Sequence, residues 1–298
     1  MKQSQTEKSL LSLRLDAVLN LYFCKEENRE QLRQFLKATT PLTDDDLATI
    51  EIKNPKLTKL HVQEKDFIVD IRLTSSTGKQ INIEMQIQKH ANFIDRMVAY
   101  NARQYASQLK KGDKYTRLKS SISLIIVDFP LFHDSTEFSE HIFFRRENRK
   151  IFTTAQQFCI IDLTKLPGIL KDDIHMWGAL FKVQTEKELK KLMEQSETMQ
   201  SAGKKLLELS ADESAREIAN AREESQWAWE DTLASTEEAG YNRGLEQGIE
   251  QGIEQGIEQR NLEIVMTSLA KGLDVQTISS ISGLAVDVIE KLKLKAVK

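Results

Sequence analysis

Two short segments, residues 67–74 and 80–88, alternate between apolar and polar side chains on either side of a Ser-Ser-Thr-Gly sequence. Alternation with a period of two predicts β-strands that each have one apolar face. A three-residue loop, with Gly78 in the left-handed conformation, pairs Ser75 with Lys79 and therefore Asp70 with Glu84. This part of the chain is thus expected to form a hairpin that holds two carboxylates side by side on its polar face.

Directly opposed residues of an antiparallel pair have Cβ atoms roughly 5 Å apart, where two like charges destabilise a sheet. A divalent cation offsets this repulsion, and Mg²⁺ commonly binds one or two carboxylates together with water and substrate phosphate. The alternative is that Asp70 and Glu84 are solvated acids on the outer face of a hairpin, because antiparallel sheets often face water on one side.

Further motifs follow in order along residues 10–170. They are Asp16, Lys25-Glu-Glu-Asn28, Asp70, Glu84-Met-Gln86, Arg96 with Tyr100, Tyr105, Gln108-Leu109, Gly112 with Tyr115, and an apolar strand at 122–127 followed by Asp-Phe-Pro-Leu-Phe132. This set resembles the PD-(D/E)xK nuclease superfamily and, within it, the bacterial recombination-promoting nucleases, which are also described as transposases. The resemblance implies an α/β fold, a restriction-endonuclease-like mixed sheet flanked by helices, followed here by an α-helical C-terminal tail.

The resemblance implies that Asp70, Glu84 and Gln86 are catalytic and that the first two bind Mg²⁺ or Mn²⁺. Gln86 stands where the superfamily pattern has Lys, as is common in the recombination-promoting branch. A neutral amide can orient water but cannot stabilise developing negative charge as a cation does. Lys89 or Arg72 could supply that charge, or each could be an ordinary solvated cation.

Asp16 is expected to be a third, auxiliary metal ligand. The family usually carries Phe-Lys shortly after this aspartate, whereas this chain has Leu19-Asn20. An acid among many apolar neighbours needs a partner, which a metal ion or a helix-capping role would provide.

A basic stretch follows the second strand. Residues 89–119 contain eight bases and two acids, a net charge of +6, and the apolar spacing predicts a helix. The expected DNA-binding residues are Lys89, Arg96, Arg103, Lys110 and Lys111. Such contacts give affinity for phosphates without sequence choice. The alternative is a solvated amphipathic helix.

The chain is expected to divide into four segments: a nuclease domain (1–185), an acidic helical connector (186–243), a tandem repeat (244–260) and a small helical segment (261–298). Residues 208–238 carry ten acids and two arginines. They are expected to form a solvated helix, or an acidic arm that covers the basic helix as a phosphate mimic.

The tandem repeat is Gly-Leu/Ile-Glu-Gln, four times in succession. A period of four residues is helical, and the glycine stripe weakens an isolated helix by up to ~1 kcal/mol per glycine. The repeat is therefore expected either to associate with a second copy or to serve as a spacer. The three short helices expected at 261–270, 275–282 and 285–294 resemble a helix-turn-helix, although a small dimerisation bundle is the preferred interpretation. We therefore expect the protein to form a homo-oligomer through this region.

Composition limits which other classes of protein the chain can belong to. The 298-residue chain is 40% hydrophobic and carries a net charge of −3. It has no apolar run long enough to cross a membrane and no export signal. Two cysteines, Cys24 and Cys159, fit neither a disulfide framework nor a zinc site. A cytoplasmic protein is expected.

The function expected from the sequence is a metal-dependent DNA endonuclease that uses water rather than a covalent intermediate, with a role in recombination, transposition or defence against foreign DNA. Cleavage of RNA is a further possibility, because nothing in the sequence recognises a 2′-hydroxyl. The alternative from another class is a non-catalytic protein that binds DNA or associates with itself.

Overall fold

The computed structural model describes residues 9–53, 70–134 and 136–296. The chain divides into two compact units, Met1–Ser225 and Gln226–Lys298. The first holds a mixed sheet and most of the helices. The second holds most of a long helix and two short ones.

The sheet of the first unit contains six strands within the described residues, in the order β1-β2-β3-β4-β6-β5. Their bounds are β1 Ile50–Lys53, β2 Ile71–Ser75, β3 Gln80–Gln86, β4 Ser121–Val127, β5 Phe138–Phe144 and β6 Ile151–Asp162. Strands β3, β4 and β6 run parallel, and the remaining neighbours are antiparallel. This is the restriction-endonuclease-like α/β architecture that the sequence predicts, with β4 at the expected strand.

The predicted hairpin is confirmed over the described residues. Strand β2 pairs with β3 in the register Ile71↔Ile83, and the Ser75 N–H donates to the Lys79 carbonyl at 2.9 Å. Gly78 has φ +88°, the left-handed conformation that the turn requires. The part of the first predicted strand at 67–69 lies outside the described residues.

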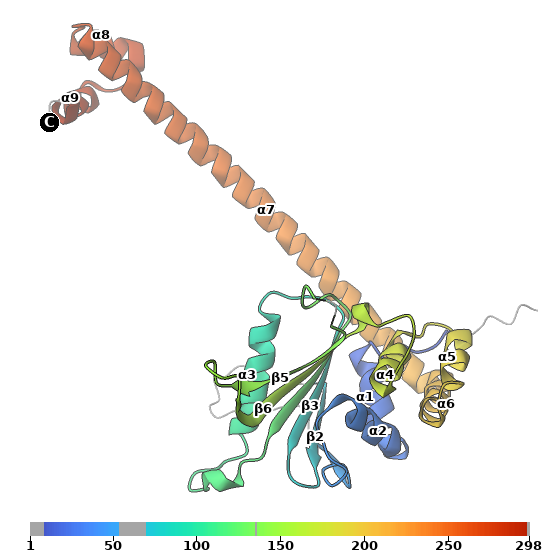
Figure 1. Ribbon diagram of the computed structural model, residues 1–298. Helices are drawn as coiled ribbons and strands as arrows, with labels where there is room; N and C mark the ends of the chain where they lie inside the picture. Colours follow the sequence, from blue (N-terminus) through green and yellow to red (C-terminus); the bar gives the residue numbers. More distant parts are fainter. Residues whose placement is uncertain (1–8, 54–69, 135, 297–298) are drawn as a thin grey trace, which may run out of the picture. The chain divides into compact units, whose positions relative to one another are not determined.

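Helices cover both faces of the sheet (Figure 1). One face carries α3, Phe93–Ala106. The other carries α1 Asp16–Phe23, α2 Arg29–Thr39, α4 Asp173–Lys182, α5 Glu186–Met193 and α6 Glu197–Ala211. The described part of this unit also contains short 3₁₀ helices at Glu26–Asn28, Tyr115–Arg117 and Leu163–Lys165.

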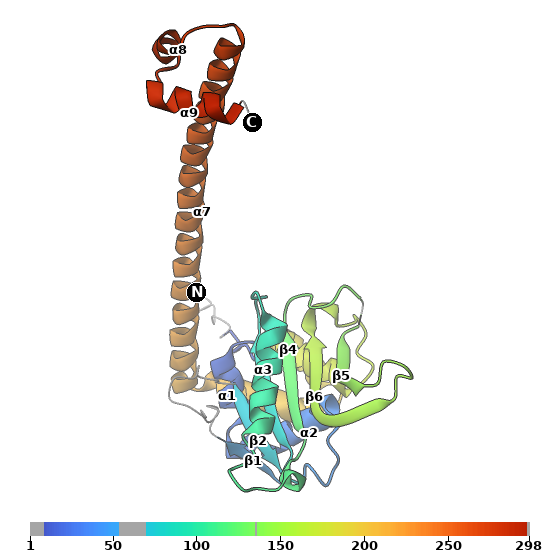
Figure 2. The same ribbon diagram turned by 90° about the vertical axis from the view of Figure 1, so that its left-hand side faces the viewer.

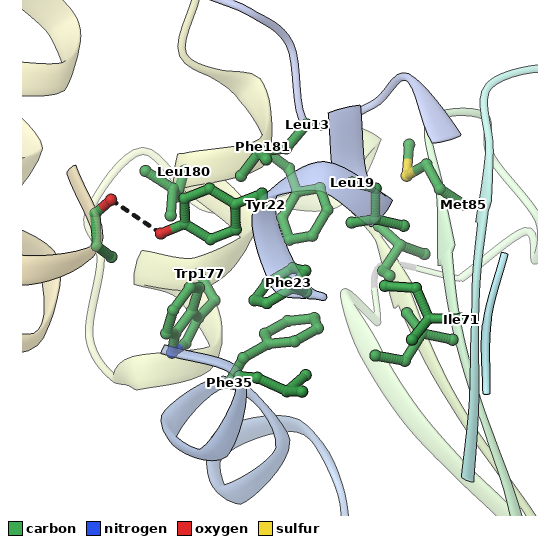
Figure 3. Packing of buried hydrophobic residues seen from close by; sticks show 14 of the residues in the cluster. Leu13, Leu19, Tyr22, Phe23, Phe35, Ile71, Met85, Trp177, Leu180 and Phe181 are labelled. Atoms are coloured by element: carbon green, nitrogen blue, oxygen red, sulfur yellow. Dashed lines mark hydrogen bonds between the residues drawn. The ribbon is translucent and has the colours of Figure 1, made fainter. Parts of the chain in front are cut away.

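The main core lies between the sheet and the five helices α1, α2 and α4–α6. Aromatic rings gather there, and Figure 3 shows Phe23, Phe35 and Trp177 packed together. The Tyr22 hydroxyl donates to the Ala202 carbonyl at 2.8 Å, so α1 is tied to α6. A second cluster, which includes Phe93, Met97 and Ile125, lies under α3.

The main core continues into residues that the sequence assigns to the connector. Buried side chains from α5, α6 and the start of α7 (Glu213–Ala270) belong to it, namely Leu189, Leu192, Met199, Ala202, Leu206, Leu209, Ala215 and Ala219. The sequence assigns this stretch to a connector that begins at residue 186, whereas in the structure the stretch packs as part of the first unit. The other segment boundaries stay predictions.

The second unit contains the rest of α7, then α8 (Val275–Ser282) and α9 (Val286–Ala296). The tandem repeat is helical, as its period predicts, but it continues without a break through the first of the three helices expected at the C-terminus. Asp274 caps α8, accepting from the N–H groups of Gln276 and Thr277 at 3.0 Å each. Val265, Ile278 and Ile289 form a small core. Within the described residues, no helix combines the length and apolar character needed to cross a membrane.

Candidate active site

The candidate carboxylates lie on the α3 side of the sheet. Ile81, Ile83 and Met85 of β3 belong to the main core on the opposite side, so alternation directs Asn82, Glu84 and Gln86 towards α3. Asp70 directly precedes β2, and extending the pairing Ile71↔Ile83 by one residue sets Asp70 opposite Glu84. Asp70 and Glu84 are therefore neighbours, as the hairpin register predicts.

Hydrogen bonds fix the position of Asp70. One of its carboxylate oxygens, Oδ2, accepts from the backbone N–H of Met85 at 2.7 Å. Its carbonyl accepts from the Asn20 side chain of α1 at 3.1 Å. Asn20 stands where the resembled family usually has Lys, and here it links the first helix to the backbone of the site.

Glu84 is a buried acid with an unused oxygen. Its side chain is 3% exposed, and Oε1 has no hydrogen-bond partner among the described residues. Burial raises the pKa of Glu84 well above its usual value, and the negative charge of Asp70 adds to the rise. An unpaired buried oxygen of this kind costs about 1–3 kcal/mol unless something binds it.

Asp70 is perturbed in the same direction. The pKa of Asp70 is raised to about 7, mainly by burial and also by the charge of Asp16, while the Met85 N–H, Arg222 and Arg96 limit the rise. Two adjacent carboxyls with raised pKa values form a site that favours either a proton or a cation.

Gln86 is joined to a cation from α3. The Arg96 guanidinium donates to Oε1 of Gln86 at 2.9 Å, and the positive charge of Arg96 lowers the pKa values of Asp70 and Glu84. Arg96 also lies over the Phe93 ring, 5.9 Å from its centroid. Arg96, rather than Lys89 or Arg72, is thus the cation that the structure brings to the position of the missing lysine.

A buried polar network holds α3 on the sheet. The Asn101 side chain donates to the Ser123 hydroxyl at 2.9 Å, and that hydroxyl donates to Oδ1 of Asn82 at 2.7 Å. Asn82 lies two residues before Glu84. The network therefore fixes the helix that supplies Arg96 relative to the strand that supplies the carboxylate.

Asp16 has a protein partner. It is the first residue of α1, and Arg222 of α7 donates to its carboxylate through Nε and Nη2, at 2.7 and 2.6 Å. No group of three or more His, Cys, Asp or Glu side chains suited to a metal ion occurs in the part of the chain that is described. Asp16 lies near enough to affect the pKa of Asp70, but its role as a ligand stays a prediction.

The other predicted DNA-binding residues are spread along one helix and the loop after it. Lys89 is exposed in the loop after β3, Arg103 is half-buried in α3, and Lys110 and Lys111 are exposed beyond it. The helix predicted over 89–119 is too long, because α3 ends at Ala106 and Gly112 adopts φ +92°. Fourteen helical residues span about 20 Å, and of the five predicted residues Arg96 is the one whose charge lowers the pKa values of Asp70 and Glu84.

Two residues near the site were given no role from the sequence, although one of them, Asp128, begins the Asp-Phe-Pro-Leu-Phe motif. The backbone N–H of Asp128 donates to the Gln86 carbonyl at 2.9 Å, and the Asp128 carboxylate pairs with Arg14 at 2.5 Å. The position of Asp128 directly after a buried parallel strand is a usable signal, because parallel strands end at one edge. Arg222 gives no such signal, since it lies 206 positions from its partner within an acidic stretch.

Comparison with known proteins bears on these observations. The family model described as PD-(D/E)XK nuclease family transposase matches residues 13–236, more than half of the chain. The matched range contains both carboxylates, Gln86, Arg96 and Arg222. No curated protein and no solved structure matched.

Proposed function

The chain belongs to the PD-(D/E)XK nuclease family transposases, and from this premise we propose that it is a divalent-metal-dependent DNA endonuclease. Membership of the family supports a nuclease-type function. The observation that carries the finer proposal is the buried Glu84, whose Oε1 lies opposite Asp70 without a partner among the residues that the structure describes.

The donor set suits a hard divalent cation. Mg²⁺ and Mn²⁺ bind carboxylate oxygens, and two carboxylates with raised pKa values gain most from a positive charge between them. In this proposal Asp70 and Glu84 hold the cation, which when bound would activate a water molecule and neutralise charge on the phosphate. Asp16 would join as an auxiliary ligand only by releasing Arg222.

The chain's own residues then orient the substrate. Because Oε1 of Gln86 accepts from Arg96, the side-chain amide keeps its N–H donors for a phosphate oxygen. Arg96 supplies beside it the positive charge that a lysine would otherwise supply. Lys89, Arg103, Lys110 and Lys111 are proposed to contact the DNA backbone further along the duplex.

Plasmid nicking tests the proposal. Wild type, Asp70→Ala and Glu84→Ala are incubated with supercoiled DNA and Mg²⁺, Mn²⁺ or EDTA. We expect metal-dependent cutting by wild type alone. Equal cutting by all three proteins would reject the site assignment, and no cutting by wild type with any metal would favour the alternative function.

That alternative is a DNA-binding protein without catalysis. It is favoured by the neutral Gln86 in place of Lys and by the absence, within the described residues, of a third metal-ligating side chain beside the pair. Under this alternative Asp70→Ala keeps the DNA affinity of wild type and metal-dependent nicks never form. A labelled RNA strand in the same assay tests the choice between DNA and RNA.

Self-association through the second unit is proposed separately. The repeat exposes a stripe of large apolar residues at intervals of four, Leu245, Ile249, Ile253 and Ile257, each more than half exposed. A Cβ added at any glycine of the repeat meets nothing within 4 Å. Sedimentation of wild type and of Ile249→Glu/Ile253→Glu tests whether a second copy covers this stripe. A monomeric wild type would exclude it.

A further inference from the structure

The hairpin formed by β5 and β6 ends in a run of ten exposed residues, 143–152, here called the hairpin tip. Its four large apolar side chains are largely open to solvent: Phe143 47%, Phe144 58%, Ile151 60% and Phe152 74% exposed. Apolar side chains that gather on one exposed element usually mark an interaction surface. Nothing in the proposed function uses this element.

The hairpin tip is also strongly basic. It contains Arg145, Arg146, Arg149 and Lys150 but one acid, Glu147, giving a net charge of +3. None of the four cations forms an ion pair with a residue that the structure describes, whereas Arg14, Arg117 and Arg222 each pair with an aspartate. Four cations without a described ion-pair partner, among exposed aromatic rings, match the chemistry of a nucleic-acid surface.

The turn that carries these cations has a defined backbone. The Arg145 N–H donates to the Lys150 carbonyl, and the Arg149 N–H donates to the Arg145 carbonyl, both at 2.8 Å. Phe144 lies opposite Ile151 in the strand register. Binding therefore needs little ordering of the main chain, which favours affinity.

The hairpin tip lies on the side of the sheet that carries the candidate active site. Phe143 lines an apolar groove of about 370 Å³ together with Ile94 and Val98 of α3, and α3 covers the face to which Glu84 points. Figure 1 shows the hairpin and α3 on the same side of the sheet, and Figure 2 shows the hairpin projecting beyond it.

The distance along the sheet from Glu84 to the hairpin tip is close to the length of one helical turn of a DNA duplex. Glu84 is level with Ile160 through the pairings of β3 with β4 and of β4 with β6. From Ile160 back to Ile151 the strand covers at most about 30 Å. One helical turn of B-DNA is about 34 Å long, so a duplex cut at Glu84 can reach the tip.

We propose that the hairpin tip is a second duplex-binding element, in which the four cations contact phosphates and Phe144 and Phe152 contact sugars or bases. The inference rests on the proposed function, because the scissile phosphate fixes where the duplex lies. Contacts of this kind position DNA and add little sequence choice. A duplex is preferred to an anionic lipid surface because the same side of the sheet holds the candidate phosphate-binding groups Gln86 and Arg96.

Binding of a fluorescein-labelled 20-base-pair duplex in EDTA, followed by anisotropy at several salt concentrations, tests the inference. The tip variant replaces Arg145, Arg146, Arg149 and Lys150 by Ala, and the matched control replaces Lys187, Lys190, Lys191 and Lys204, which are exposed on α5 and α6. We expect the tip variant to bind at least roughly tenfold more weakly and to lose about three to four units of salt slope. The control changes affinity less than twofold.

Two further arms separate the possible outcomes. Phe144→Ser/Phe152→Ser is expected to weaken binding roughly tenfold with an unchanged salt slope, and both tip variants should need more protein than wild type to reach half-maximal plasmid nicking. Wild-type affinity in the tip variant, or equal loss in tip and control variants, would overturn the inference while leaving the nuclease in place. Duplex binding that depends on the tip, without nicking under any metal, would reject the nuclease alone.

Vesicles of phosphatidylglycerol provide the competing surface. If wild type binds them through the tip but its duplex affinity is unaffected by the tip substitutions, the partner is a lipid surface and the inference is wrong. Absence of any duplex binding by wild type overturns it as well.

Discussion

The two ends of the β2–β3 hairpin each lie beside a buried acid, but the acids have opposite surroundings. Near the turn, Asp46 is 1% exposed and accepts hydrogen bonds from Lys79 Nζ at 2.7 Å, from the Thr43 N–H and hydroxyl at 2.9 Å each, and from the Thr77 hydroxyl. At the open end, Glu84 leaves Oε1 without a described partner.

The pKa values follow these surroundings. Burial by itself would raise the pKa of Asp46, but the hydrogen bonds from Lys79, Thr77 and Thr43 together lower it well below its usual value. The pKa values of Asp70 and Glu84 are raised instead. An acid whose partners are all supplied by the protein serves structure, whereas an acid left incomplete is available for a ligand.

The largest expected difference is in activity. Glu84→Gln keeps the side-chain size but removes the charge, and we expect nicking to fall roughly 10³-fold or more, equivalent to about 4 kcal/mol. The matched substitution Asp46→Asn should leave the nicking rate unchanged at a temperature where the protein is folded. A plasmid assay on both variants measures this, and equal losses would remove the distinction between the two acids.

The free energy of unfolding should respond in the reverse order, with the larger loss in Asp46→Asn than in Glu84→Gln. Asp46→Asn removes the charge that Lys79 and two threonines stabilise, and we expect the free energy of unfolding at pH 7 to fall by about 3 kcal/mol. Because the folded-state pKa of Asp46 is lowered, its contribution is present above about pH 4 and is lost as the pH falls below that value. Urea unfolding at pH 7 and pH 3 checks this. A difference that persists undiminished at pH 3 would contradict it.

Asp70→Asn is expected to raise the free energy of unfolding in EDTA, whereas Asp46→Asn lowers it. Folded Asp70 keeps its proton up to about pH 7, while the unfolded chain loses it near pH 4. Between these values ionisation stabilises the unfolded chain alone, so wild type becomes progressively less stable as the pH rises. The variant should be more stable than wild type by about 2 kcal/mol at pH 8 and equal to it at pH 4. Urea unfolding of both proteins between pH 4 and pH 8 measures this difference. A variant less stable than wild type at pH 8 would refute the assigned burial effect.

The smallest effect is metal-linked stabilisation. Mg²⁺ at ten times its Kd should raise the free energy of unfolding of wild type by about 1.4 kcal/mol. Glu84→Gln should gain far less, and Asp46→Asn should gain as much as wild type from its lower starting value. Thermal unfolding with and without Mg²⁺ gives the comparison. The same gain in Glu84→Gln and wild type would place the cation elsewhere.

Local features of the fold could be predicted because they depend on neighbouring residues. Alternation gave the strand faces, Gly78 gave the turn, and both together gave the register that sets Asp70 opposite Glu84. The same approach failed where neighbouring residues mislead. The apolar spacing after Phe93 suggested a helix to 119, although Gly112 adopts a conformation outside the helix, and the acidic character of 208–238 concealed the buried Ala215 and Ala219.

The sequence by itself determined which acids face each other, because a two-residue period and a tight turn leave one register. Only the tertiary structure decided what surrounds them. Arg222 reaches Asp16, Arg96 reaches Gln86 and Asn20 reaches the Asp70 carbonyl from three different helices. Burial and partner choice depend on how these distant elements pack, and this packing raises the pKa values of two carboxylates that the linear pattern could only place side by side.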